Sequence, residues 1–406
     1  MTENKDKKLT CHECNLSLEL PVLSVGQKAI CPRCGYYLTV NHGRAFEQIA
    51  AFAIAALILL FLSLSFDFVS LHYQGQAHTI SLLDTYFILV EQGYFILGFL
   101  LVLTVVILPL VVIAGLLYLT FFIEFDRYPA YGTQVAKVLL ALLPWSMAEI
   151  FLIGVLVSLI KISTLANIGI GLSFYAYVLF SICFITTIQY IDKQALQDRL
   201  QCLMAKKSSD LNEKINEKIN EKTNEKQEAI VNKDSVLQHQ EQANRSIQKT
   251  WALLITSLFL YFPANLLPIM TTRSLGKEEL NTILGGVMVL WQSGSYPIAI
   301  VIFIASIVVP IVKFIVLAWL NYSVQQGSQD FQLQRMQLYR ITEFVGRWSM
   351  IDIFAVAILA SLIQLGTAMT IRPGHAAIAF CGVVILTMLA ANTFDSNLIW
   401  KKKNKI

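Results

Sequence analysis

Eight apolar stretches constrain the fold of this chain more than any other feature. A helix of about 20 apolar residues crosses the ~30 Å hydrocarbon core of a bilayer, where backbone polar groups must be satisfied within helices or closed barrels. Only 14% of the residues are charged and 56% are hydrophobic, a composition typical of membrane proteins. The sequence predicts an all-α integral membrane protein with eight transmembrane helices, at residues 47–70, 94–123, 145–165, 167–190, 250–270, 295–320, 348–366 and 375–394.

Lysine and arginine residues are distributed unevenly over the predicted loops. The first outer loop, residues 71–92, contains neither, whereas short cytoplasmic loops are expected to be rich in both. The polar N-terminus runs straight into a cysteine motif, without the apolar segment of a cleavable signal peptide. We therefore expect both termini in the cytoplasm, on the side of Arg127, Lys137, Arg335, Arg340, Arg347 and the tail lysines 401–403 and 405.

An internal duplication relates the two halves of the chain. The segment WSMAEIFLIGVLVSLIKI, residues 145–162, matches WSMIDIFAVAILASLIQL, residues 348–365, at nine of eighteen positions with an offset of 203. Upstream, Pro109 aligns with Pro310 at an offset of 201. Repeats with an even number of spans share one topology, so an axis along the membrane normal should relate them. We predict two tandem four-helix repeats with a site between them.

The duplication and the polar segments suggest domain boundaries. A run of four NEK units in residues 211–226 is solvated and at most partly helical, because like charges four residues apart weaken a helix. In the matched helices, Gly154 and Ser158 correspond to Ala357 and Ser361, small residues that permit close helix packing in lipid. We expect an N-terminal module at 1–44, repeats at 45–191 and 249–397, a charged cytoplasmic linker at 192–248 and a basic tail at 398–406.

Two CxxC pairs near the N-terminus predict a metal site. Cys11, Cys14, Cys31 and Cys34 form CHEC and CPRC, separated by sixteen residues, which is a spacing typical of a four-cysteine zinc site. Four thiolates close the tetrahedral shell and leave no position for water, so the zinc should be structural. A redox dithiol would need a thioredoxin-like βαβ context that thirty residues do not supply. The four cysteines thus predict a small N-terminal zinc ribbon, and we expect this ribbon to support only the first repeat.

Ionisable and polar groups within the predicted spans are candidates for a transport pathway, since charges are costly in the bilayer. Glu149 and Asp352 occupy equivalent positions near the inner interface, and Lys313 lies where it could pair with Asp352. Structural ion pairs or snorkelled side chains are equally good interpretations of these charges. The segment FPANLLP is expected to interrupt the fifth span twice and to mark a lumen. The candidates are Glu149, Lys161, Asn265, Lys313, Asp352 and Thr387.

Motifs of soluble enzymes are missing. The sequence contains no GxxxxGK[ST] loop for nucleotide phosphates, no HExxH and no GxSxG. The net charge of +4 gives no electrostatic basis for binding nucleic acid. We therefore expect the protein not to be an enzyme.

Several motifs resemble the paraquat-inducible protein A family over nearly the whole chain. They are GRWSMIDIF at 346–354, FPANLLPIM at 262–270, VIFIASIVVPIVKF at 301–314 and VVILTMLAANTFDSNLIW at 383–400. The resemblance implies an inner-membrane protein of diderm bacteria that works with a periplasmic MCE-domain partner forming a tunnel for lipid traffic. Family members typically carry a second zinc ribbon before the fifth span, where this chain has only Cys202 and the NEK segment; Ser396 and Asn397 also depart from the family pattern.

The leading functional hypothesis is a lipid-transport subunit that moves phospholipid between the inner membrane and an MCE tunnel, through a cavity between the repeats. One alternative is a secondary transporter or efflux protein for an amphipathic small molecule, consistent with the repeat architecture. Another is a membrane redox or metal-sensing protein that uses the ribbon.

Overall fold

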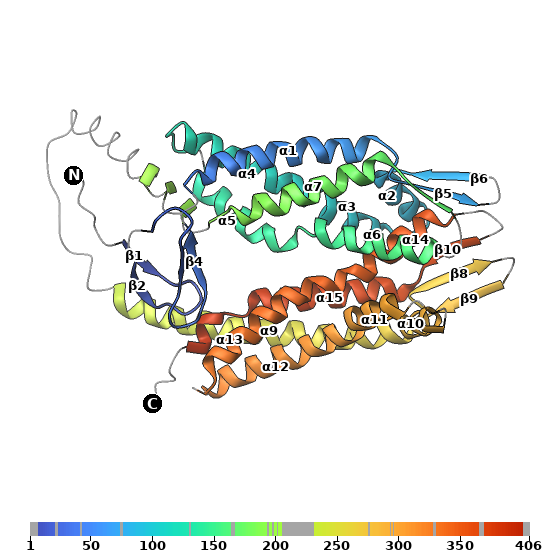
Figure 1. The fold of residues 1–406 in the computed structure, drawn as a ribbon. Helices are drawn as coiled ribbons and strands as arrows, with labels where there is room; N and C mark the ends of the chain where they lie inside the picture. The colour runs from blue at the N-terminus through green and yellow to red at the C-terminus, as the bar shows by residue number, and fades with distance from the viewer. Residues whose placement is uncertain are drawn as a thin grey trace.

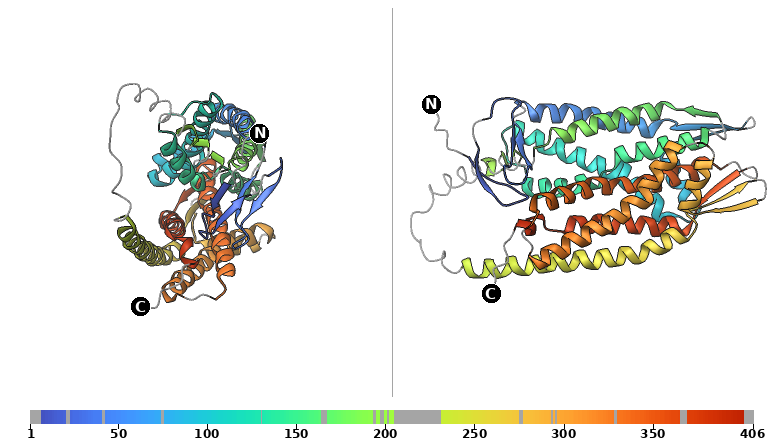
Figure 2. Two further views of the ribbon diagram at one scale, coloured as in Figure 1. Left: turned by 90° about the vertical axis from the view of Figure 1, so that its left-hand side faces the viewer. Right: turned by 60° about the horizontal axis from the view of Figure 1, so that its bottom comes forward.

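The computed structural model describes residues 7–400 except 21–22, 41–42, 74–75, 130, 164–166, 193–194, 197–198, 201, 205–230, 275–276, 293, 295, 328–329 and 365–368. The protein is mostly helical, and its long helices run side by side (Figure 1). Four short strands near the N-terminus lie at one end of the helices, which is also the end where the described chain finishes, and six further strands lie at the other end (Figures 1 and 2).

Seven helical segments of the described chain are long and apolar enough to cross a membrane. They correspond to the predicted spans other than the fifth. That span falls on α9, Val231–Leu266, whose polar N-terminal part extends a long way beyond the apolar residues. The NEK run lies outside the described residues. The seven segments are Ala45–Ser65, Phe95–Glu124, Gly132–Ile160, Leu172–Gln189, Ala299–Gln326, Gln332–Leu362 and His375–Thr393.

The same order of elements occurs twice along the chain. The helices of the two series lie largely on opposite sides of the molecule (Figure 2). The first series is α1 (Ala45–Ser65), β5 (Val69–Tyr73), β6 (Gln76–Ile80), α2 (Leu82–Glu91), α3 (Phe95–Val102), η1 (Leu103–Ile107), α4 (Leu108–Glu124), α5 (Gly132–Leu142), η2 (Leu143–Trp145), α6 (Ala148–Ser163), β7 (Asn167–Ile170) and α7 (Leu172–Gln189). The second is α9, β8 (Met270–Ser274), β9 (Lys277–Asn281), α10 (Ile283–Gln292), α11 (Tyr296–Phe303), η3 (Ile304–Val308), α12 (Val309–Gln326), α13 (Gln332–Gly346), η4 (Arg347–Met350), α14 (Ile351–Leu362), β10 (Met369–Pro373) and α15 (His375–Thr393), followed by η5 (Ser396–Trp400).

A π-helical segment interrupts the same long helix in each series. Each π-helical segment ends two residues before a proline: η1 before Pro109 and η3 before Pro310. Proline has no N–H and its ring clashes with the carbonyl four residues earlier. A wider i→i+5 turn, with the N–H of Leu108 bonded to Leu103 O and that of Val309 to Ile304 O, accommodates the ring without ending the helix. The aligned prolines therefore shape both helices alike.

Two small antiparallel sheets, unexpected from the sequence, cap the end of the bundle opposite the N-terminal strands (Figure 1). Strand β5 pairs with β6 and with β7, and β8 pairs with β9 and with β10. The first sheet thus joins the segment after α1 to the segment before α7. The second sheet joins the segment after α9 to the segment before α15. This pairing ties the ends of α1 and α7 together, and those of α9 and α15.

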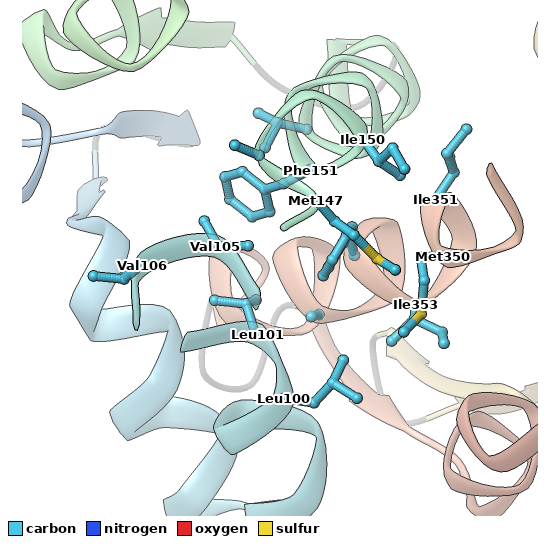
Figure 3. Packing of buried hydrophobic residues seen from close by; sticks show 14 of the residues in the cluster. Leu100, Leu101, Val105, Val106, Met147, Ile150, Phe151, Met350, Ile351 and Ile353 are labelled. Atoms are coloured by element: carbon cyan, nitrogen blue, oxygen red, sulfur yellow. The ribbon is translucent and has the colours of Figure 1, made fainter. Parts of the chain in front are cut away.

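Helices α6 and α14, which carry the duplicated sequence, pack against each other at the centre of the main apolar core. Met147, Ile150 and Phe151 lie near Met350, Ile351 and Ile353 (Figure 3). Pro144 lies in η2, the 3-10 turn that separates α5 from α6.

Gly154 and Ser158 lie in the contact between α6 and α14. The Ser158 hydroxyl is within hydrogen-bond distance of Gly154 O at 2.8 Å and of Ala355 O across the interface at 3.2 Å. A Cβ at position 154 would lie 2.9 Å from the Cβ of Phe354 and 3.2 Å from Ile351 O. The small residues therefore permit the packing between the two series.

Replacing Gly154 with leucine should force α6 and α14 apart. Overpacking of this kind costs about 1–3 kcal/mol or more, so we expect a lower midpoint of thermal unfolding for the purified protein. Gly286→Leu is the matched control, because no atom lies within 4 Å of the Cβ position there. Equal midpoints for the two variants would contradict the tight contact.

Candidate functional site

Two β-hairpins bring the four N-terminal cysteines together. Strand β1 (Lys7–Thr10) pairs with β2 (Ser17–Leu20), and β3 (Lys28–Ile30) pairs with β4 (Tyr37–Val40). Each CxxC occupies the turn of its hairpin. All four Sγ atoms lie within 4.8 Å of one another, with Cys11 to Cys34 and Cys14 to Cys31 at 3.6 Å. A tetrahedral ion with metal–sulfur bonds of about 2.3 Å separates its ligands by about 3.8 Å, so the cluster fits a metal ion.

The backbone of the two turns supports this arrangement. Asn15 and Gly35 have φ values of 53° and 66°, a left-handed conformation that glycine and asparagine tolerate best. Their N–H groups donate to Cys11 O and Cys31 O, both at 2.9 Å. Burial raises the pKa of Cys31, but backbone N–H groups of Cys34 and Arg33 donate to its sulfur and bring the pKa down to about 7. Burial raises the pKa of Cys14 and Cys34, so among these three thiols only Cys31 has surroundings that favour the thiolate form that binds metal.

The cysteine module contacts both series of helices, so the expectation that it supports only the first is wrong. After α7, Asp192 accepts hydrogen bonds from the Thr39 hydroxyl and from the N–H of Val40, the latter at 3.1 Å. From α13, Arg340 donates to Cys34 O at 3.2 Å, and its guanidinium lies 5.2 Å from the ring centroid of Tyr36. The module bridges the two series because these partners come from distant parts of the sequence.

Trp400 at the end of the described chain extends this contact. Its side chain packs against the buried cysteine cluster. The guanidinium of Arg33, within the second CxxC, lies 4.5 Å from the centroid of the Trp400 ring, a separation at which cation–π attraction operates. The C-terminal end of the second series is thereby held to the N-terminal module.

A cavity of about 580 Å³ lies between the two series, close to the cysteine module. We call it the central cavity. Arg340 is in its wall and also touches Cys34, so the cavity and the module share a residue. Its lining combines ionisable and apolar side chains: Leu140, Leu143, Pro144, Ser146, Glu149, Ile185, Ile188 and Gln189 from the first series, and Lys313, Arg340, Thr342, Glu343, Phe344, Arg347, Met388, Ala391 and Asn392 from the second.

Two of the predicted charges, Glu149 and Lys313, line the central cavity. An oxygen of Glu149 lies 3.8 Å from Arg347 Nη1, with 33% and 28% of the two side chains exposed. Lys313 is buried, and its ammonium donates to the hydroxyl of Thr387 at 2.9 Å. The sequence suggested that Lys313 could pair with Asp352. In the structure Lys313 instead contacts Thr387, which is also one of the candidate transport residues.

Asp352 lines a separate, smaller cavity of about 60 Å³ that also contains Ser158 and Met270. Its carboxylate accepts a hydrogen bond from the Ser306 hydroxyl in η3. All residues of α14 are buried, so this carboxylate lies inside the protein. Glu149 and Asp352, equivalent in sequence, therefore occupy different cavities.

Of the remaining candidates, Asn265 is not in the wall of either cavity. Lys161 belongs to α6, but its side chain lies outside the described residues. The amide of Asn265 donates to Tyr261 O at 2.9 Å, one turn earlier in α9. The double interruption expected at FPANLLP is wrong, because α9 continues through Pro263 and ends at Leu266, before Pro268. Neither proline is in the wall of the two cavities described above.

Sequence reasoning missed several polar residues of the central cavity, among them Ser146, Arg340 and Arg347. Ser146 and its counterpart Ser349 stand in the two WSM motifs, and both hydroxyls are buried without a hydrogen-bond partner among the described residues. Arg340 and Arg347 were used only to orient the chain. Their position close to the duplicated helix is the sequence signal that could have identified them.

A family comparison identifies the fold family to which these features belong. The model of the family described as paraquat-inducible protein A matches residues 46–201 and 247–404. The two matched ranges cover the two series of helices, apart from Ala45 and the N-terminal part of α9, and omit the cysteine module and most of the polar linker. No solved structure gives a significant match to the chain.

Curated relatives resemble the chain along its whole length. The intermembrane transport protein PqiA of Escherichia coli (strain K12) is 38% identical over 405 residues, covering 98% of this chain and 96% of its own. The lipophilic envelope-spanning tunnel protein A of the same strain is 29% identical, covering 96% and 90%. A probable intermembrane transport protein of Haemophilus influenzae is 29% identical, covering 99% and 97%.

Proposed function

Because the chain belongs to the paraquat-inducible protein A family, we propose that it is the inner-membrane subunit of an MCE-type intermembrane lipid transport system. In this proposal it moves phospholipid between the inner membrane and a periplasmic tunnel formed by an MCE-domain partner. The names of its relatives, which describe intermembrane transport and an envelope-spanning tunnel, support this direction. No catalytic step is required.

The central cavity is the observation that carries the proposal. It lies between two series of membrane-spanning helices and combines charged side chains with apolar ones such as Leu143, Ile188 and Phe344. A phospholipid has the same division between a charged headgroup and apolar chains. A soluble polar solute would leave the apolar wall unmatched, and a purely apolar one would leave the charges buried without partners.

We also infer that the two series are tandem repeats, at residues 45–191 and 249–397, related by an axis along the membrane normal. The recurring element order, the paired π segments and the aligned prolines support this inference. In this arrangement α9 supplies the fifth of eight spans. The module at 1–44, the linker at 192–248 and the tail at 398–406 then lie in the cytoplasm, where Lys137, Arg340 and Arg347 follow the positive-inside rule.

Zinc is the metal that we propose for the cysteine cluster. Four thiolates in a tetrahedral arrangement favour zinc over hard cations such as Mg²⁺ and Ca²⁺. Cys11, Cys14, Cys31 and Cys34 are buried and complete the shell, so the ion would stabilise the module without supplying chemistry. Its role is to hold the N-terminal module against both repeats.

Glu149, Lys313, Asp352 and Thr387 are the residues that we propose for the transport pathway, since they lie in or beside the two cavities. Lys161 and Asn265 stay secondary candidates. The carboxylates of Glu149 and Asp352 and the ammonium of Lys313 offer protonation sites through which a proton gradient can act. A lipid gradient or a separate ATPase would make such coupling unnecessary.

Co-purification of the full-length protein tests the function. We expect phospholipid to accompany the protein through purification in detergent, and an MCE-domain protein from the same bacterium to be recovered with it. Transfer of a fluorescent phospholipid from donor vesicles containing the protein should require that partner. Proton-coupled uptake of a water-soluble solute, without bound phospholipid, would instead favour the secondary-transporter alternative.

A further inference from the structure

The wall of the central cavity contains a buried ammonium group. Lys313 is 2% exposed, and its side chain crosses α13 at Gly346, where a Cβ would lie 2.8 Å from Nζ. An ammonium has three N–H donors and no acceptor. Among the described residues, the hydrogen bond to Thr387 uses one of these donors. A neutral hydroxyl does not balance a buried positive charge, which is costly unless it is paired.

A second unsatisfied polar group faces the same cavity from the other repeat. Ser146 lines the cavity and is 3% exposed, and its hydroxyl has no hydrogen-bond partner in the described part of the chain. Buried hydroxyls nearly always have a partner. A ligand that brings hydrogen-bond acceptors into the cavity would satisfy both Ser146 and Lys313.

Two arginines add to this positive wall. Arg347 lies 3.8 Å from Glu149, which is beyond hydrogen-bond distance, so its N–H groups remain available to a closer acceptor. Arg340 donates to Cys34, yet its Nε is buried without a partner among the described residues. Guanidinium groups match the spacing of phosphate oxygens. The lining therefore offers several donors to one anionic group with several oxygens.

We propose that the central cavity binds the phosphodiester group of a phospholipid headgroup, with Lys313, Ser146 and Arg347 as its hydrogen-bond donors. This inference rests on the proposed function and deepens it by naming the part of the lipid that is recognised. Glu149 and Glu343 line the same cavity. A headgroup that also carries an ammonium, such as ethanolamine, therefore has both of its charges matched.

Binding of a short-chain lipid tests the proposal directly. The full-length protein in detergent is titrated with dioctanoyl phosphatidylethanolamine, and bound lipid is counted by native mass spectrometry. Dioctanoylglycerol, which lacks the phosphodiester, should bind about tenfold more weakly or worse. Inorganic phosphate should fail to displace the lipid. Equal binding of dioctanoylglycerol would overturn the proposal, and displacement by phosphate at matching concentration would identify free phosphate as the ligand instead.

Matched variants locate the site. Lys313→Met retains the length of the side chain without its charge and should weaken phosphatidylethanolamine binding about tenfold, and Ser146→Ala about threefold. Ser349→Ala is the control, because Ser349 is 1% exposed, has an equally unpartnered hydroxyl and is not part of the cavity wall. Affinities of Lys313→Met and Ser146→Ala equal to that of the unmodified protein would refute the site.

These experiments distinguish a failure of the proposed headgroup site from a failure of the proposed lipid-transport function. If the unmodified protein binds phosphatidylethanolamine and the variants bind it equally well, this inference fails while the proposed function stands. If the unmodified protein binds no phospholipid and none accompanies it through purification, the proposed function fails too. The midpoint of thermal unfolding of each variant shows whether a loss of binding comes from unfolding. Ser146→Ala removes a single oxygen atom, so it tests the site even if Lys313→Met does not fold.

Discussion

Replacing Cys34 with serine should release the metal ion and unfold the N-terminal module. The two hairpins form only a small hydrophobic cluster, in which the four cysteines are the buried residues. A module of this size depends on its metal, and a structural zinc site contributes about 10–16 kcal/mol of folding free energy. We expect the zinc content measured by mass spectrometry to fall from about one ion per chain towards zero.

The loss should extend beyond the module because its contacts join the two repeats. Arg340 would lose Cys34, and Asp192 would lose Thr39 and Val40. Hydrogen exchange should therefore rise at residues 7–40 and also in α13, while α6 and α14, in the main core, should keep their protection. A chelator applied to the unmodified protein should reproduce this pattern.

Cys202→Ser is the matched control for this prediction. Cys202 is exposed and lies outside the cluster, so its replacement should change neither the zinc content nor the exchange rates. A full complement of zinc in Cys34→Ser would contradict the four-cysteine site. Rapid exchange confined to residues 7–40 would show that the module does not hold the repeats.

Seven of the eight predicted spans coincide with helical segments of the described chain that are long and apolar enough to cross a membrane, because the signal for such a span is local. An apolar run of about 20 residues identifies a membrane helix without knowledge of its neighbours. The cysteine cluster could be predicted from the sequence equally well, since the CxxC turns are short and each directs two thiols towards one point. Membership of the paraquat-inducible protein A family is confirmed by the family comparison.

Contacts between segments that are distant in the sequence could not be predicted from a local pattern. The strands of the two small sheets are five residues or fewer, and β5 pairs with β7 across almost the whole first repeat. Asp352 and Ser306 meet because of how η3 packs against α14. Pro263 misled the sequence interpretation, since a proline in a membrane helix is tolerated when other groups satisfy the freed backbone carbonyls.

Gly171 and Gly374 are the positions at which the smallest substitution should have the largest effect on stability. Each precedes the last helix of its repeat, α7 or α15. The N–H of Gly171 donates to Phe68 O at 3.1 Å, and that of Gly374 to Ile269 O at 2.7 Å. These bonds fasten the start of the last helix to the loop that follows the first helix.

Adding one methyl group at either glycine should unfold this junction. A Cβ would lie 1.9 Å from the backbone oxygen of Asp67 at position 171, and 2.0 Å from that of Pro268 at position 374. Backbone atoms cannot rotate away as a side-chain end can, so Gly171→Ala and Gly374→Ala should each cost more than about 3 kcal/mol, the upper end of ordinary overpacking. We expect little folded protein by size-exclusion chromatography in detergent, and a lower unfolding midpoint for any that is recovered.

Gly286→Ala in α10 is the matched control, because a Cβ there meets no atom within 4 Å and alanine favours a helix over glycine by about 1 kcal/mol. Its unfolding midpoint should equal or exceed that of the unmodified protein. The same loss for Gly171→Ala and Gly374→Ala would further show that one junction is built twice, since the two contacts are equivalent in the two series of elements. If only one of the two variants is destabilised, the repeats do not depend on this contact equally. Normal stability of both would mean that the loops after α1 and α9 do not lie against the last helices.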